Sequence, residues 1–158
     1  MANDTHIKFD GVEGEATHKD HKGEIEVLGW RWEVTNSSQI AGGGSGKGKA
    51  NAGHMIFVHR YDKASPVLAK NCASGKHFGE VKLTARKSGE GQKDFLTVKM
   101  KEVFINSVKP SGDPQGNINE EVTMTYGDIE FEYKPQDDKG GMGGAVKFGW
   151  NVKETTTR

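Results

Sequence analysis

The stretch GEIEVLGWRWEVTN, residues 23–36, decides the fold that we predict for this chain. Its apolar residues lie first at odd and then at even positions: Ile25 and Val27, followed by Leu28, Trp30, Trp32 and Val34. Side chains alternate between the two faces of a strand, so this change of parity moves the buried side from one face to the other. Gly29 lies at the change, where a bend or bulge is easily accommodated. We therefore predict one long, bent strand whose polar face carries Gly29, Arg31 and Glu33.

Alternation predicts further strands along the chain, and residues 54–61, which are apolar at both parities, predict a strand that is covered on both faces. These strands lie at residues 5–9, 54–61, 78–86, 96–105, 121–133 and 146–152. In the strand at 78–86, the pattern directs three side chains inward and four outward: Val81, Leu83 and Ala85, against Glu80, Lys82, Thr84 and Arg86. Parity changes again near Lys101 and Glu102 and once more at Gly127. We expect the chain to bend at both places.

Residues 65–73 carry the only convincing helix signals. Ser65 can cap the helix, Pro66 suits its first turn, and Gly75 suits its C-terminal stop. A helix of about ten residues is too short to be stable alone, so we expect it to dock on a sheet.

Long polar loops at residues 10–22 and 36–53 separate the predicted strands. Loops of this length in a compact domain are usually functional. Long strands that change their buried face suit two sheets that share bent strands. The sequence therefore predicts a mainly all-β fold, a squashed β-barrel of two bent antiparallel sheets with one short flanking α-helix. We expect a single domain over residues 1–158.

The charge balance excludes several classes of protein. Lysine plus arginine and aspartate plus glutamate each number 22, so the formal net charge is zero. A protein bound to nucleic acid or acidic lipid would show a basic excess, so we expect no nucleic-acid partner and no stable membrane insertion. The single cysteine, Cys72, cannot form an internal disulfide. The N-terminal residues hold no apolar run, so we expect synthesis in the cytosol without a conventional signal peptide.

Motifs for chemistry are incomplete in this sequence. Residues 43–50, GGSGKGKA, resemble a phosphate-binding loop, but Ala50 stands where a hydroxyl group would hold magnesium. His18 and His21, with Asp20, could form a weak metal site, although zinc sites normally have three or four protein ligands. Neither a nucleophile elbow nor a His-Glu-x-x-His motif occurs. We therefore expect no catalytic residues, no cofactor and no bound metal.

Three blocks of sequence resemble one known family. They are IKFDGVEGEATHKDHKGEIEVLGWRWEV (7–34), YDKASPVLAKNCASGKHFGEVKLTARKSGE (61–90), and MTYGDIEFEYKPQ with AVKFGWNVKE (124–136 and 145–154). Together they resemble haemolysin-coregulated protein, Hcp, from about Ile7 to Glu154. That family supplies the tube subunit of the bacterial type VI secretion system.

The resemblance implies a β-barrel subunit that assembles into a homo-hexameric ring with a wide central channel. It also implies that rings stack into a tube and that the subunits are related to phage tail-tube proteins. The implied partners are a spike protein, a sheath and small effector proteins carried in the channel. The protein would be cytoplasmic in a Gram-negative bacterium before firing and secreted afterwards.

Candidate contact residues follow from the resemblance and from strand parity. The family position occupied by Arg31 lines the channel and touches cargo, and Gly29 and Glu33 share its polar face. We expect these three residues to face the channel and contact effectors. The polar loops provide candidates for ring interfaces or stacking, namely Glu15, His18, His21, Gly42, Gly44, Lys47 and Lys49.

Two other functions stay open at this stage. A small-ligand carrier would enclose an apolar pocket inside the barrel. A metal hydrolase would use His18 and His21. A monomer with a bound small molecule would favour the carrier, and stoichiometric zinc would favour the hydrolase.

Overall fold

The structure, a computed structural model, describes residues 3–38, 49–87, 93–136 and 143–158. Within these ranges, one helix, α1 (Ser65–Ser74), accompanies a series of strands. The strands are β1 (Asn3–Phe9), β2 (Ile25–Glu26), β3 (Gly29–Arg31), β4 (Val34–Asn36), β5 (Ala50–Ala52), β6 (Met55–Arg60), β7 (Phe78–Lys87), β8 (Asp94–Gly112), β9 (Ile118–Thr125), β10 (Asp128–Tyr133), β11 (Val146–Asn151) and β12 (Thr156–Thr157).

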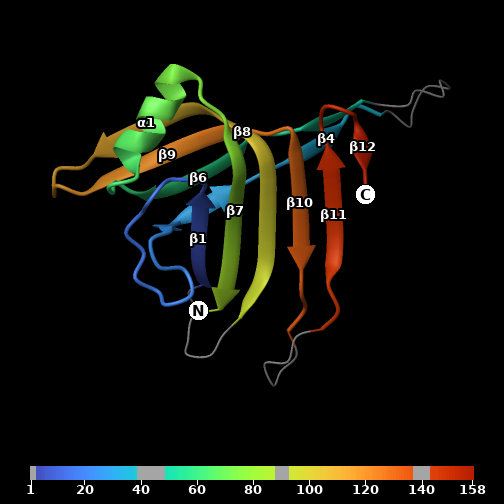
Figure 1. Cartoon of the computed structure of the whole chain (residues 1–158), viewed down its shortest axis with the longest axis horizontal. Helices are drawn as coiled ribbons and strands as arrows, with labels where there is room; N and C mark the ends of the chain where they lie inside the picture. The colour runs from blue at the N-terminus through green and yellow to red at the C-terminus, as the bar shows by residue number, and fades with distance from the viewer. Residues whose placement is uncertain (1–2, 39–48, 88–92, 137–142) are drawn as a thin grey trace.

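Two antiparallel sheets share strand β8 (Figure 1). The large sheet has the order β12-β11-β10-β8-β7-β1-β2. The small sheet has the order β3-β6-β9-β8, and β4 and β5 form a separate ribbon. The predicted mainly β fold, with two bent sheets and one helix, is confirmed.

Strand β8 is 19 residues long and turns the corner between the sheets. Its first part pairs with β7 and β10, and its later part pairs with β9. At the bend, Glu102 has a φ of 52°, a left-handed conformation that is uncommon for a residue other than glycine. Met100 and Val103, on either side, are both fully buried, so the buried parity changes as predicted. The core fills the space between the two sheets.

Residues 23–36 differ from the prediction, because they form three short strands instead of one long one. β2 pairs with β1, β3 pairs with β6, and β4 pairs with β5. Each short segment has a different partner, so no continuous ladder can form. Trp30 and Trp32 pack against the core as expected. Leu28 and Val34, also expected inside, are 52% and 49% exposed.

Residues 121–133 also divide into two strands, β9 and β10, which belong to different sheets. The break is at Gly127, whose N–H donates to the carbonyls of Lys101 and Glu102 at the bend of β8. Met124 before it and Ile129 after it are fully buried. The predicted change of buried face at Gly127 is therefore confirmed.

Helix α1 packs beside β8 (Figure 1). Pro66 lies in its first turn, and Gly75 ends it with a φ of 70°. Ser65 does not cap the helix, because its Oγ accepts a hydrogen bond from the N–H of Asp62 instead. The Asp62 carboxylate accepts from the N–H of Ala64. No helix in the described ranges is long and apolar enough to cross a membrane.

Loop 10–22 packs against the large sheet and corrects one detail of the β7 prediction. Thr84 and Arg86 point away from the core, as their parity requires, but they are only 3% and 5% exposed. Asp20 and His21 of the loop lie on Arg86 and cover this part of the sheet. Parity alone cannot show that a distant segment covers an outward-facing side chain.

Candidate functional site

The predicted channel residues Gly29 and Arg31 lie on the outer face of the small sheet, where strand pairing brings them beside residues of β6 and β9. Arg31 on β3 pairs with Ile56 on β6, which pairs with Thr123 on β9. In the next row, Gly29 pairs with Val58. The alternate residues, including Phe57, point into the core. We call the surface formed by Gly29, Arg31, Ile56, Val58, Glu121 and Thr123 the small-sheet face.

Arg31 projects from this face with a side chain that is 64% exposed. Its Nη2 lies 3.7 Å from Oε2 of Glu121 on β9. An exposed pair at this separation contributes little stability, so Arg31 stays available to an external group. Gly29 has nothing within 4 Å of the position that a Cβ would occupy, so this part of the face is open. Glu33 is exposed, just beyond the end of β3.

A hollow of about 260 Å³ lies at one end of the small-sheet face, lined by Arg31, Trp32, Glu33, His54 and Ile56. Its floor is held by Trp32, whose Nε1 donates to the Tyr126 hydroxyl at 2.5 Å. That hydroxyl donates onward to the Gly53 carbonyl at 2.7 Å. Burial raises the pKa of Tyr126, which keeps its phenol protonated. The two charged residues of the hollow, Arg31 and Glu33, therefore lie beside an aromatic side chain that hydrogen bonding holds in place.

Three candidate interface residues lie in loop 10–22, and the structure places them differently. Glu15 is exposed, and its carboxylate accepts from the N–H of Lys63 at 2.7 Å. His18 is half-buried. His21 is buried, with 6% exposure, and lies between Glu24 and Arg86. His21 therefore braces the loop within the subunit, and contact of any of the three with another copy stays a prediction.

Lys49 is the one candidate stacking residue from residues 36–53 that lies in the described ranges. It is exposed beside the β4–β5 ribbon, and its N–H donates to Ser37 Oγ at 2.9 Å. Gly42, Gly44 and Lys47 lie outside the described residues, as does residue 48. Their predicted roles are therefore untested.

Five of the seven exposed large apolar side chains in the described residues form two groups that sequence parity did not identify. The first group is Leu28, Tyr61 and Ile118: the N–H of Tyr61 donates to the carbonyl of Ile118, and Leu28 shares a hollow of about 240 Å³ with Tyr61. The second group is Tyr133 and Val146, which are partners across β10 and β11. We call these the Leu28 group and the Val146 group.

Leu28 of the first group and Val146 of the second lie toward opposite edges of the large sheet, whereas Tyr61 and Ile118 lie beside the small sheet. Leu28 follows β2, the strand at one edge, whereas Val146 belongs to β11, next to the strand at the other edge. Leu28 is 52% exposed and Val146 is 65% exposed. One subunit thus presents two different apolar surfaces on two sides. A sequence-based search could have suspected Leu28, because it lies at the parity change itself.

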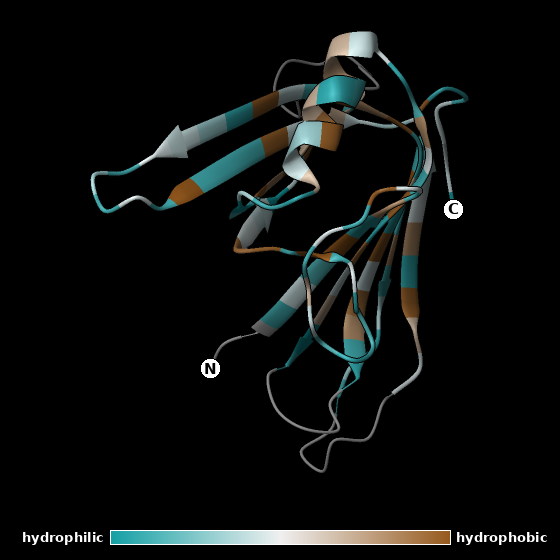
Figure 2. Cartoon of the chain, turned by 60° about the vertical axis from the view of Figure 1, so that its left-hand side comes forward, coloured by the Kyte–Doolittle hydropathy of each residue, from teal (hydrophilic) through white to brown (hydrophobic). Residues whose placement is uncertain are grey.

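The C-terminal end of β8 and the N-terminal end of β9 project from the body of the subunit (Figure 2). They extend from the body as a hairpin, and residues 109–119 are exposed. Asp113 orders the tip by accepting the N–H groups of Gln115 and Asn117, each at 2.9 Å. These hydrogen bonds lower the pKa of Asp113, which keeps it ionised. The hairpin is a stable extension that can reach beyond the subunit.

A buried histidine at the base of this hairpin was missed by sequence reasoning. His59 Nε2 lies 2.9 Å from Glu120 Oε1, and neither residue exceeds 1% exposure. Burial raises the pKa of nearby Asp62, while the charge of His59 opposes that rise. Both side chains are shielded from solvent and are partners across β6 and β9, so the arrangement is suited to holding these two strands together. In those residues, no group of three or more His, Cys, Asp or Glu side chains is placed to hold a metal ion.

Comparison with known proteins gives consistent matches over nearly the whole chain. The family profile described as "Type VI secretion system effector, Hcp" matches residues 6–133. Protein hcp1 of Pseudomonas aeruginosa is 40% identical over 158 residues, which cover 98% of this chain and 98% of that relative.

Solved structures agree in fold as well as in sequence. The chain of "Structure of a type six secretion system protein" is 31% identical, with a TM-score of 0.93, over 99% of this chain and 100% of that one. Hcp1 from Salmonella typhimurium is 32% identical, with a TM-score of 0.80, over the full length of both chains.

Proposed function

This chain belongs to the Hcp family of type VI secretion system effectors, and from that premise we propose that it is a structural subunit of the secretion tube. Six copies form a closed ring, rings stack, and small effector proteins occupy the central channel. The sheath and the spike of the apparatus are the further partners. Hcp proteins of this system are secreted, and this one is cytoplasmic until the apparatus fires.

The observation that carries the proposal is the placement of the Leu28 group and the Val146 group. A ring of identical subunits needs a head-to-tail interface, in which each subunit contributes two different, complementary surfaces. Two exposed apolar groups, one beside β2 and the small sheet and the other on β10 and β11 of the large sheet, meet that requirement. Apolar side chains at the centre of an interface are buried on association and provide most of its binding free energy.

The small-sheet face supports the second half of the proposal. It is a mixed surface in which exposed Arg31 and half-buried Glu121 lie beside Ile56 and Val58. A surface of this kind can bind varied protein cargo through polar and apolar contacts without committing to one partner. In a ring that places this face inward, six copies of Arg31 encircle the channel.

The ring is tested by charged substitutions in the two groups. Leu28→Asp and Val146→Asp should each prevent ring formation, because a carboxylate would be buried in the interface without a partner. Val67→Asp is the matched control, since Val67 is 38% exposed on α1 and belongs to neither group. Native mass spectrometry and electron microscopy should show rings for the parent and the control and monomers for the two variants.

Mixing the two variants gives the sharper test. Each variant keeps one intact surface, so a head-to-tail interface predicts dimers in an equimolar mixture and nothing larger. If rings form from either variant alone, the assignment of these surfaces is wrong. A parent protein that stays monomeric at every concentration would refute the ring itself and would favour the ligand-carrier alternative.

The channel assignment is tested separately with Arg31→Glu. This substitution should leave ring formation intact and change the retention of co-expressed effectors, because it reverses six charges in the channel. Lys147→Glu serves as the control, since Lys147 is 60% exposed on the large sheet, away from the small-sheet face. Equal effector retention by both variants and the parent would refute a channel location for Arg31.

A further inference from the structure

Arg86 is a buried cation that holds loop 10–22 on the large sheet. Its Nε donates to Asp94 Oδ1 and its Nη1 donates to Asp20 Oδ2, each at 2.9 Å. Its Nη2 lies 3.2 Å from Nε2 of His21. Asp20 and His21 belong to the loop, and Asp94 begins β8, so one guanidinium group joins three segments. The bond from Arg86 lowers the pKa of Asp20, which keeps that carboxylate ionised.

His21 has polar partners at both ring nitrogens. Nδ1 lies 2.9 Å from Oε2 of Glu24. Nε2 lies 3.2 Å from Oδ1 of Asp94 and the same distance from Nη2 of Arg86. The imidazole ring of His21 therefore ties the loop to both β7 and β8.

His6 lies directly beneath His21. Their ring centroids are 4.6 Å apart and their planes differ by 10°, so the rings stack. His6 is 3% exposed, and its Nδ1 is buried without a hydrogen-bond partner. Thr84, its partner on β7, has a buried Oγ1 that also lacks one. If the loop lifted, water could form hydrogen bonds with both atoms. The free energy of these two buried polar groups therefore favours release of the loop.

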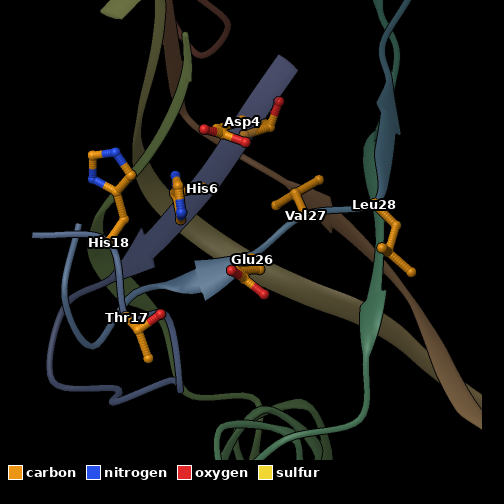
Figure 3. A pocket seen from close by; sticks show the side chains of 8 residues that line it. Asp4, His6, Thr17, His18, Glu26, Val27 and Leu28 are labelled. Atoms are coloured by element: carbon orange, nitrogen blue, oxygen red, sulfur yellow. The ribbon is translucent and has the colours of Figure 1, made fainter. Parts of the chain in front are cut away.

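Some of the charged and titratable groups around His6 raise its pKa, and others lower it. They come from every element packed on it: Asp4 and Lys8 on β1, Glu24 and Glu26 at β2, Arg86 on β7, and His18 and His21 in the loop. Burial is the largest influence and lowers the pKa of His6, and His21 lowers it further. Glu24 and Glu26 raise it but do not reverse the result. Figure 3 shows His6 between Asp4 and Glu26, with His18 beside the same hollow.

We propose that buried His6, stacked beneath His21, makes loop 10–22 a pH-dependent latch, which is seated when the His6 ring is neutral and released when acid protonates it. In the released loop, His6 regains its ordinary pKa of 6.5. Protonation therefore favours release, because the pKa is lower in the seated state. The seated form is fully stable above about pH 6.5 and loses stability as the pH falls from there through the lowered pKa.

The latch would regulate the assembly proposed above, and this consequence rests on that proposed function. Glu15 and Ala16 of the loop line the same hollow of about 240 Å³ as Leu28 and Tyr61. Release of the loop would remove one wall of this hollow and change the surroundings of the Leu28 group. Acid should therefore weaken the ring interface as well as free the loop.

Hydrogen exchange of the loop amides measures the latch directly, whatever the assembly state. The N–H of Asp10 donates to the carbonyl of Glu80 on β7, and the N–H of Lys63 donates to the carboxylate of Glu15, so both hydrogen bonds join the loop to the rest of the subunit. With exchange times corrected for the intrinsic effect of pH, the protection of these two N–H groups should fall between pH 7.5 and pH 5, because protonation of His6 favours the released loop. The protection of β7 and β8 should not change.

Substitution of His6 separates the latch from general acid sensitivity. His6→Phe retains a ring that can stack on His21 but cannot be protonated, so the loop should stay protected to a lower pH. His77→Gln removes an exposed histidine outside the cluster and should behave like the parent. Equal acid-induced loss in the parent and in His6→Phe, or unchanged protection of the parent at pH 5, would overturn the latch. Particle mass at both pH values shows whether rings form. If no ring forms at pH 7.5, the proposed function is refuted, but the latch is still tested by hydrogen exchange of the loop.

Discussion

The buried pair of His59 and Glu120 offers the sharpest test of how the small sheet is held together. The two residues are partners across β6 and β9, with Nε2 and Oε1 2.9 Å apart. His59 is completely buried and Glu120 is 1% exposed. The change Glu120→Leu removes one partner and leaves the imidazole ring in the core without its hydrogen bond.

The expected loss of unfolding free energy is large. Removing one member of a buried pair costs about 3–5 kcal/mol, because the other is left desolvated and unpaired. For a chain of this size, each kcal/mol lowers the melting temperature by about 2–4 °C, so the total shift is roughly 6–20 °C. Glu120→Gln should cost less, since its amide oxygen can still accept from Nε2. Glu121→Gln, at the neighbouring position on the outer face where the side chain is partly exposed, should change stability by under about 1 kcal/mol.

A double-mutant cycle shows whether the cost arises from the pair. His59→Phe combined with Glu120→Leu replaces both polar groups with apolar ones and should be more stable than Glu120→Leu alone. Denaturant unfolding followed by circular dichroism measures each variant, at one fixed protein concentration because assembly adds stability. A loss under 1 kcal/mol for Glu120→Leu, or additive effects in the cycle, would refute the reasoning.

Three further predictions concern backbone packing and the floor of the small-sheet hollow. Gly14→Ala should destabilise the subunit by about 1–3 kcal/mol, because its Cβ would lie 2.5 Å from the Glu24 carbonyl oxygen, whereas Gly29→Ala meets nothing within 4 Å and should be neutral by the same unfolding assay. Trp32→Phe removes the bond to the Tyr126 hydroxyl, so thermal unfolding should show a loss of about 1 kcal/mol or more. Burial raises the pKa of Tyr126, so spectrophotometric titration should show one tyrosine ionising above the other two. Because the folded pKa is the higher one, the stability that Tyr126 contributes is complete below about pH 10 and is lost as the pH rises further.

Sequence parity predicted which side chains of residues 23–36 are exposed, but it did not predict which residues from other segments lie beside them. Gly29, Arg31 and Glu33 are all exposed, as the alternation along residues 23–36 required. Their common polar side was predictable because alternation is a property of neighbours along one strand. The Leu28 group could not be predicted in the same way, since Tyr61 and Ile118 come from distant segments. Whether any of these residues contacts effectors or another subunit stays a prediction.

By itself, the sequence determined most of the strand segments, the changes of buried face near Glu102 and at Gly127, and where the helix ends, but it did not show β5, which lies in the predicted loop 36–53. Alternating side chains, Gly127 at a break, Pro66 at a helix start and Gly75 at its stop act through backbone preferences and near neighbours. The tertiary structure alone decided which strands pair and what covers them. It divided residues 23–36 among three partners and buried Arg86 beneath loop 10–22. These outcomes depend on contacts between segments far apart in the chain, which no local pattern specifies.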